Sequence, residues 1–153
     1  MNENIKGLVD DTGSLSLTEE SFAHLFDNAP KCKAGKSQIH GYGLIAAEAI
    51  AAGEPIVDFR NPDVYTEKPY SELERWRLQG GKYTGVSEER CIVSDRMTKY
   101  SLLNHSPTPN AALDIQNRQI VATRAIQPGE EVTTDYRLEP MSPEARSYVQ
   151  EFL

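Results

Sequence analysis

The sequence predicts a mostly β fold with short helices at its two ends and one short helix inserted between strands. Short runs rich in β-branched residues alternate with turn residues, as in the runs 111–115 and 119–125 around the turn 116–118. Near the C-terminus, Ser142-Pro143-Glu144 is typical of a helix start, with an N-cap serine, a first-position proline and an acidic first turn. The 153 residues are enough for one domain with a core that needs no disulfide.

The remaining elements follow from local signals along the chain. Ser16 and Glu19 fit a capping box and predict a helix over 17–27. A second capping box at 71–74 predicts a short helix that Gly80-Gly81 ends. Further strands are expected over the apolar runs 55–59, 91–93 and 132–136.

The last helix has one apolar face. Ala145, Tyr148, Val149 and Phe152 recur at helical spacing, so this face is expected to pack on the domain. The expected organisation is an N-terminal arm with a short helix over 1–30, a central domain over 31–138 and the amphipathic helix over 139–153.

Net charge restricts the partners. The chain carries −7, and residues 1–30 alone hold six acidic side chains and one lysine. An acidic chain argues against nucleic acid as a direct partner, because phosphate binding needs a basic surface. The charge is compatible with a cationic substrate, although many ordinary soluble proteins are as acidic.

Cysteine usage and hydropathy suggest the cellular setting. Cys32 and Cys91 are the only cysteines, and their separation matches no zinc-binding spacing. No signal peptide and no apolar stretch of membrane-spanning length is present, so no membrane is expected. The expectation is an intracellular protein without a metal, in the cytoplasm of a bacterium or in the nucleus of a eukaryotic or viral host.

The first candidate site lies at Ile39-His40-Gly41-Tyr42-Gly43-Leu44. Two glycines one residue apart let the backbone turn tightly and approach a ligand closely. The third glycine of a dinucleotide-binding fingerprint is missing, and no long helix begins here. A plain turn between two strands explains the pattern equally well.

Two further blocks carry unusual polar chemistry. In Asn104-His105-Ser106, followed by Pro109-Asn110, an amide and an imidazole offer both hydrogen-bond donors and acceptors from one loop. Pro109 fixes the conformation at the exit of this loop. The segment 129–136 closes this region and delivers a phenol, Tyr136, at the end of a β-branched run.

These three blocks, in this order, resemble the SET-domain family of S-adenosylmethionine-dependent protein lysine methyltransferases. The resemblance covers roughly residues 34–138 and implies a β-clip fold of small curved sheets, in which the chain threads a loop as a pseudoknot. Threaded connections are rare, so periodicity alone does not predict one.

The resemblance also implies roles for individual residues. Gly41, Tyr42 and Gly43 match the segment whose backbone cradles the methionine part of the cofactor. Asn104 and His105 match the pair that holds the cofactor, with His105 near the adenine.

Tyr136 matches the tyrosine at the methyl-transfer site. Methyl transfer to an amine needs positioning more than acid–base work, and the amine must be neutral although a free lysine has a pKa of about 10.4. An apolar channel and a nearby sulfonium would lower that pKa. The alternative for Tyr136 is a buried core tyrosine at the end of a strand.

The substrate channel is less well defined by sequence. Its candidates are four aromatic residues, which sequence does not rank, and one aliphatic residue that occupies the place where some relatives limit methyl number: Phe59, Tyr65, Tyr83, Tyr100 and Leu113.

The chain also departs from the family pattern. Pro107 replaces a cysteine, and no cysteine follows Tyr136, so the zinc-binding tail of many relatives is absent and no zinc is expected. Tyr148 and Phe152 are expected to pack over the cofactor or channel instead. Ser101 and Thr134 also differ from the usual arginine and phenylalanine. The resemblance is therefore to a minimal SET protein.

The function expected is transfer of methyl groups from S-adenosylmethionine to a lysine of a protein substrate, either a histone or another basic protein. The alternative is a catalytically silent SET fold kept as a binding or scaffold module, which the departures at 101, 107 and 134 motivate. A monomer and a homodimer, in which one tail completes the channel of the other chain, both remain open.

Overall fold

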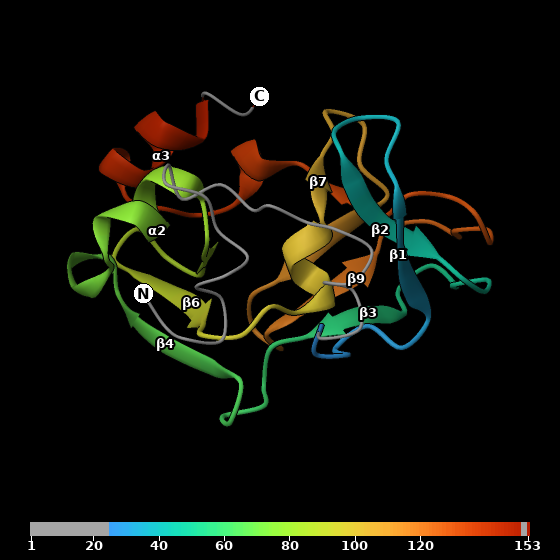
Figure 1. Cartoon of the computed structure of the whole chain (residues 1–153), viewed down its shortest axis with the longest axis horizontal. Coiled ribbons are helices and arrows are strands. Elements are labelled where there is room, and N and C mark those ends of the chain that lie inside the picture. Colours follow the sequence, from blue (N-terminus) through green and yellow to red (C-terminus); the bar gives the residue numbers. More distant parts are fainter. Residues whose placement is uncertain (1–24, 151–152) are drawn as a thin grey trace. The chain divides into compact units, whose positions relative to one another are not determined.

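The computed structural model describes residues 25–150 and 153 and divides the chain into two compact units. Unit 1 contains Asn61–Met97 and Tyr136–Leu153, and unit 2 contains Leu25–Arg60 and Thr98–Asp135 (Figure 1). The expected arm, and the expected helix over 17–27 up to residue 24, lie outside the described residues. The last three positions of that expected helix, 25–27, are not helical.

Unit 2 is built from three small sheets and a 3-10 helix, η3 (Lys99–Leu102). The first sheet is the antiparallel pair of β1 (Cys32–Lys36) and β2 (Tyr42–Ala46). A three-stranded antiparallel sheet has the order β3-β9-β8, and its strands are β3 (Pro55–Asp58), β9 (Gln119–Ala122) and β8 (Ala111–Asp114). The third sheet is a parallel pair of β7 (Asn104–His105) and β10 (Thr133–Thr134).

The β8–β9 hairpin confirms the prediction made from the runs 111–115 and 119–125. Its turn is closed by Asp114, whose carboxylate accepts hydrogen bonds from the backbone (3.2 Å) and side chain (2.8 Å) of Asn117. Arg118 takes a positive φ of 53° in this turn. Strand β3 also confirms the prediction over 55–59, and the 37–41 segment is the turn between two strands that the glycine pattern allowed.

The predicted strand over 132–136 is shorter than expected. Only Thr133 and Thr134 pair, because the partner strand β7 ends at His105 and is followed by Ser106-Pro107, where proline has no N–H to donate. The chain then leaves the ladder, and Tyr136 begins the 3-10 helix η4 (Tyr136–Leu138) of unit 1.

The described residues of unit 1 form one antiparallel sheet and four helical segments. The sheet has the order β4-β6-β5, with β4 (Tyr65–Pro69), β6 (Arg90–Ser94) and β5 (Thr84–Gly85). The helical segments are η2 (Tyr70–Glu72), α2 (Arg75–Gly80), η4 and α3 (Pro143–Val149). Strand β6 confirms the prediction over 91–93, whereas β4 and β5 have no counterpart among the predicted elements.

The inserted helix confirms one predicted end and corrects the other. Gly81 adopts the left-handed conformation (φ 65°) that ends α2. The predicted start at Ser71 was wrong, because Leu73 (ψ 139°) and Glu74 (ψ 143°) are extended and separate η2 from α2.

The C-terminal helix confirms its predicted start. The Ser142 hydroxyl accepts from the backbone N–H of Ala145 (3.1 Å), and Pro143 opens the helix. The buried core of unit 1 consists of aromatic, aliphatic and sulfur side chains from its sheet, α2 and α3: Tyr70, Leu78, Tyr83, Cys91, Val93, Met141, Ala145 and Val149. Over residues 25–150 and 153, none of the helices has the length and apolar character needed to cross a bilayer.

Candidate active site

The three sequence blocks, the third as far as Asp135, meet inside unit 2. The parallel pair β7–β10 aligns Asn104 with Thr133 and His105 with Thr134. Strand β2 contacts the same closing segment, since the N–H of Val132 donates to the carbonyl of Leu44 at 2.8 Å. The glycine block, the Asn-His-Ser block and the closing segment therefore form one contiguous site, although they are far apart in the sequence.

A polar cluster of Ser37, Asn104 and Glu131 joins the blocks. The Ser37 hydroxyl donates to the Glu131 carboxylate (2.7 Å) and accepts from the backbone N–H groups of Ile39 (2.9 Å) and His40 (3.1 Å). The amide nitrogen of Asn104 has four acceptors within reach: Ser37 Oγ (3.1 Å), the carbonyls of His40 (3.3 Å) and Tyr42 (3.1 Å), and Glu131 Oε2 (2.8 Å).

The cluster fixes the turn between β1 and β2. Asn104 Nδ2 contacts the carbonyls on both sides of Gly41, and Ser37 binds two N–H groups of the same turn. The side-chain NH2 group of Asn104 is thus directed at the turn. None of the described residues donates a hydrogen bond to the side-chain oxygen, Oδ1. The amide is therefore oriented, with its oxygen left for another donor.

The two glycines of the turn have different surroundings. Gly41 has φ +53°, and an added Cβ would meet no heavy atom of the described structure within 4 Å. At Gly43 an added Cβ would lie 2.5 Å from Glu131 Oε2 and 2.8 Å from Glu131 Cδ. Gly41 therefore leaves room for a ligand against its backbone, whereas Gly43 gives its room to a carboxylate.

His105 faces an acidic partner. Its Nδ1 lies 3.7 Å from Asp135 Oδ1, and both side chains are largely buried, with 13% and 5% of their areas exposed. The register of β7 on β10 produces this contact, because His105 pairs with Thr134, the residue before Asp135. The imidazole therefore has a carboxylate beside Nδ1 that can fix its ring orientation.

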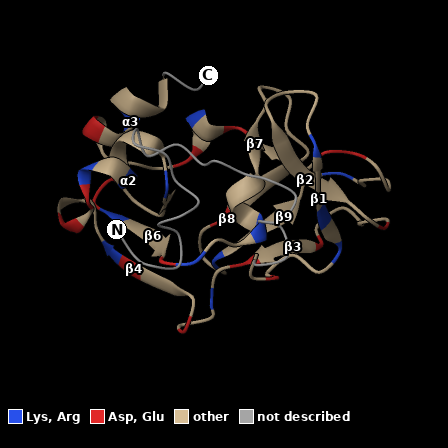
Figure 2. Cartoon of the chain, in the orientation of Figure 1, with Lys and Arg blue, Asp and Glu red and all other residues tan. Residues whose placement is uncertain are grey.

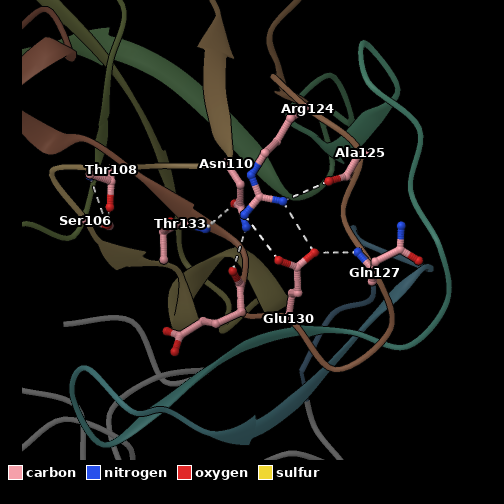
Figure 3. Close-up of polar contacts among 9 residues, drawn as sticks. Ser106, Thr108, Asn110, Arg124, Ala125, Gln127, Glu130 and Thr133 are labelled. Carbon is pink, nitrogen blue, oxygen red and sulfur yellow. Dashed lines mark hydrogen bonds and ion pairs between the residues drawn. The ribbon is translucent and has the colours of Figure 1, made fainter.

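Asn110 is a site residue whose role the sequence did not reveal. It is only 3% exposed. Its amide nitrogen donates to the carbonyl of Glu131 (2.8 Å), and its oxygen accepts from the N–H of Thr133 (2.9 Å) (Figure 3). The second block is thereby fastened to the closing segment on either side of Val132. The Pro-Asn spacing marked Asn110 as part of a motif, but its partners lie more than twenty residues away.

Further contacts in Figure 3 stabilise the turn that leads into Glu131. Glu130 accepts from the Arg124 guanidinium at 3.2 Å and from the backbone N–H of Gln127 at 2.6 Å. These contacts lower the pKa of the Glu130 carboxyl, with the Gln127 N–H as the larger cause. The turn that leads into Glu131 is therefore fixed by charge-assisted hydrogen bonds.

Tyr136 belongs to unit 1. It follows Asp135 directly and packs, partly buried, against the unit 1 core that includes Tyr70 and Tyr83. Tyr70 and Tyr83 meet edge to face with ring centroids 5.4 Å apart. The buried hydroxyl of Tyr83 has no hydrogen-bond partner among the described residues, and burial raises its pKa. Tyr83 and Tyr136 are thus brought to one cluster.

The other channel candidates are distributed over both units. Phe59 and Tyr100 meet edge to face in unit 2, with centroids 4.7 Å apart. Leu113 is half-buried in β8 opposite Ile120, also in unit 2. Tyr65 is buried at the start of β4 in unit 1.

Charges and metal ligands give further constraints. The edge strand β1 carries Lys33 and Lys36 (Figure 2). Cys32 and Cys91 are both buried thiols, and burial raises their pKa values to about 11 and about 12. Within the described part of the chain, no group of three or more His, Cys, Asp or Glu side chains is placed to hold a metal ion.

The family model of the SET domain matches residues 41–137, which include the Gly41–Gly43 turn, the Asn104–His105 pair and Tyr136. The chain belongs to the SET domain family. The match covers unit 2 from Gly41 onward together with the unit 1 insert, and ends within η4.

Curated relatives agree with this assignment. The SET chain is 33% identical over 116 residues to histone-lysine N-methyltransferase TRX1 of Oryza sativa subsp. japonica. It is 36% identical over 112 residues to an H3 lysine-4 specific histone-lysine N-methyltransferase of Cryptococcus neoformans. Each alignment covers 67% of this chain but only 11% and 8% of the respective relative.

A solved structure shows the same fold. The crystal structure of KRYPTONITE in complex with mCHH DNA, an H3(1–15) peptide and SAH matches with a TM-score of 0.50 at 22% sequence identity. The match covers 69% of this chain and 23% of that chain. The mostly β architecture expected for a SET domain is confirmed.

Proposed function

We propose that this SET protein is a protein lysine methyltransferase that uses S-adenosylmethionine. The observation that supports it most is the convergence of the three blocks in unit 2, where one polar cluster fixes the Gly41 turn. Its relatives are named histone-lysine N-methyltransferases, and the KRYPTONITE structure contains SAH, the product of S-adenosylmethionine.

The residues of unit 2 fit such a cofactor. Gly41 combines a positive φ with open space at its Cβ position, so its backbone is accessible to a ligand. Asn104 is oriented by its own Nδ2 contacts and offers Oδ1 to a donor, such as an amino group. Gly41, Tyr42, Gly43, Asn104 and His105 are therefore the residues we assign to cofactor binding.

We assign contacts with the substrate lysine to tyrosine hydroxyls. When bound, S-adenosylmethionine supplies a sulfonium methyl group that a neutral amine attacks in line. We assign to Tyr136 the role of accepting a hydrogen bond from the lysine amine and orienting its lone pair. The unpartnered Tyr83 hydroxyl, in the same cluster, would be a second group able to contact that amine.

The substrate proposed is a lysine of a basic protein, with the histone H3 tail as the first candidate. Two of the similar proteins are described with H3, one as H3 lysine-4 specific and one in complex with an H3(1–15) peptide. A net charge of −7 suits a cationic partner. The eukaryotic relatives make the nucleus the proposed location.

The side chains proposed to line the substrate channel are those predicted from the sequence: Phe59, Tyr65, Tyr83, Tyr100 and Leu113. Leu113 is half-buried and aliphatic, so we propose that it leaves room for more than one methyl group. A product limited to monomethyl-lysine would contradict this assignment.

Transfer of a labelled methyl group to a panel of histones and a cell lysate tests the proposal. Tyr136→Phe and His105→Ala are run beside the wild-type protein, and calorimetry measures binding of S-adenosylmethionine to each. The proposal expects lysine labelling that both variants lose, with cofactor binding weakened in His105→Ala and kept in Tyr136→Phe. A wild-type protein that neither binds S-adenosylmethionine nor labels lysine would instead favour the silent scaffold.

A further inference from the structure

We infer that Arg146 is a positioning residue for Tyr136, holding in place the turn that begins at the tyrosine. The inference rests on the proposed methyl transfer for its functional meaning. Arg146 lies in α3, beyond residue 137 where the SET family match ends, so nothing in that match assigns it a role.

The guanidinium of Arg146 joins two carbonyls of the segment after Tyr136. Its Nη1 donates to the carbonyl of Arg137 (3.1 Å), and its Nη2 donates to the carbonyl of Glu139 (2.9 Å). The same segment is closed on itself by the N–H of Glu139, which donates to the carbonyl of Tyr136 (3.3 Å). One side chain outside η4 thus contacts the carbonyl of its middle residue and the carbonyl of the residue that follows it.

The backbone on either side of Tyr136 contributes to holding this turn. Arg137 is exposed, and Leu138 is 78% exposed, so neither contributes a buried apolar side chain. Within the turn, Tyr136 alone packs on the unit 1 core. Since 3-10 turns of this length have weak internal hydrogen bonding, the orientation of Tyr136 depends on contacts made by the flanking backbone.

The backbone of Arg146 is fixed within α3. Its N–H donates to the carbonyl of Ser142 (2.9 Å) in the first turn of α3, and Ser142 caps the helix. Its helix neighbours Ala145 (0% exposed) and Val149 (6% exposed) belong to the core on which Tyr136 packs. The guanidinium therefore ties the tyrosine turn to the same body that receives the tyrosine ring.

The opposite side of the segment is docked on strand β5. The N–H of Gly85 donates to the carboxylate of Glu139, and the carbonyl of Pro140 occupies the place that a Cβ at Gly85 would need. The Tyr70 hydroxyl donates to the same Pro140 carbonyl at 3.3 Å. Residues 137–140 are thus held between β5 and α3, and Arg146 reaches back to the carbonyl of Arg137.

An arginine is needed because two carbonyls are bridged at once. The planar guanidinium offers paired donors in a fixed fork, whereas a lysine ammonium acts as a point charge on a flexible stem. Arg146→Lys keeps the charge and the helix but reaches one carbonyl. Small misplacement of a reacting group can cost as much as about 100-fold in rate, so the lysine variant is expected to lose activity while folded.

Arg146→Lys is tested by three measurements, with Arg90→Lys as the matched control. Arg90 is an exposed arginine of unit 1 that also donates to a carbonyl, that of Glu67 (3.4 Å). Methyl transfer to histone H3 gives kcat and KM, with Kd for S-adenosylmethionine measured separately. NMR of protein labelled at tyrosine Cζ follows Tyr136, whose signal is assigned with Tyr136→Phe.

The inference expects Arg146→Lys to lower kcat about 10-fold or more, with the Kd for S-adenosylmethionine unchanged and the Tyr136 signal shifted. Arg90→Lys should leave all three unchanged. An unmoved Tyr136 signal, or a shifted signal with unchanged kcat, would overturn the inference. If wild-type protein transfers no methyl group, the proposed function fails on its own, and the Tyr136 signal still decides whether Arg146 positions the tyrosine.

Discussion

The carboxylate of Glu131 lies over Gly43 so closely that an added Cβ would stand 2.5 Å from Glu131 Oε2. The same carboxylate accepts from Ser37 Oγ (2.7 Å) and from Asn104 Nδ2 (2.8 Å). The Glu131 carboxylate therefore requires a glycine at position 43, in addition to the cofactor contact that we propose for its backbone. Three stretches of chain that are distant in sequence therefore meet at the Glu131 carboxylate.

Gly43→Ala is expected to displace Glu131 and, with it, the contacts that fix the Gly41 turn. Binding of S-adenosylmethionine should weaken at least about 10-fold, because more than one hydrogen bond to a charged group is lost. Gly129→Ala is the control, since a Cβ there meets no described atom within 4 Å although φ is +92°.

The Gly43→Ala/Glu131→Ala double variant should lose less cofactor affinity than the two single variants added together. Removing the carboxylate relieves the clash, and contacting residues give non-additive effects. Calorimetric titration with S-adenosylmethionine measures all four proteins of this cycle. Additive losses would mean that the clash is relieved elsewhere.

Asn110→Ala should destabilise the protein strongly. It removes both hydrogen bonds of a 3%-exposed amide and leaves the carbonyl of Glu131 and the N–H of Thr133 without their partner. Each unpaired buried group costs about 1–3 kcal/mol, so the free energy of unfolding should fall by about 2–4 kcal/mol. Urea denaturation measures this. Asn117→Ala, in the exposed β8–β9 turn, serves as control, and an equal loss there would contradict the account.

Glu139 makes stability depend on pH. Burial raises the pKa of this carboxyl from 4.5 to about 7, against the opposing effects of the Gly85 N–H and of Arg146. Because the folded pKa lies above the unfolded value, the contribution to stability is complete below pH 4.5 and is lost as pH rises through 7. The neighbouring Tyr70, Tyr83 and Cys91 do not titrate in that window, since burial raises their pKa values well above it.

Glu139→Gln therefore should gain thermal stability relative to wild type as pH rises from 5 to 8.5, because it keeps an acceptor for Gly85 and removes the charge. Differential scanning fluorimetry across that range measures the difference in midpoint. A difference independent of pH would show that the carboxyl is not the titrating group.

Tyr70 and Tyr83, which are both buried in unit 1, should respond differently to loss of their hydroxyls. Tyr83→Phe removes a hydroxyl that has no partner among the described residues, so stability should be unchanged or higher. Tyr70→Phe removes the bond to the Pro140 carbonyl (3.3 Å) and should cost about 1 kcal/mol. Thermal unfolding compares them. If Tyr83 contacts the substrate amine as proposed, its phenylalanine variant alters the number of methyl groups added, which mass spectrometry reads out.

The sequence predicted those elements whose formation depends on residues close to one another in the chain. The β8–β9 hairpin and the capped start of α3 depend on neighbouring residues, and both were predicted correctly. The predicted start of α2 was wrong. Ser71 and Glu74 have the residue types and spacing of a capping box, but the chain forms the separate 3-10 helix η2 there and α2 begins later. Strand β4 was missed because its sequence, Tyr-Thr-Glu-Lys-Pro, lacks an apolar face and pairs only through β6.

The site was predictable as a set of motifs, but not as an arrangement. Resemblance to the SET family gave the predicted roles of Gly41, Asn104 and Tyr136, whereas the short parallel pair β7–β10 could not be predicted from four residues. Likewise the side chains of Asn110 and Arg146 bond backbone groups outside their own elements, a kind of contact that leaves no pattern in the sequence.

The most direct measurement is tandem mass spectrometry of histone H3 after incubation with the protein and S-adenosylmethionine. The account predicts methyl groups on lysine, and on no other residue, with none added by Tyr136→Phe even though that variant binds the cofactor. Unmodified lysines throughout H3 and the wider histone panel, from a wild-type protein that does not bind S-adenosylmethionine, would contradict it.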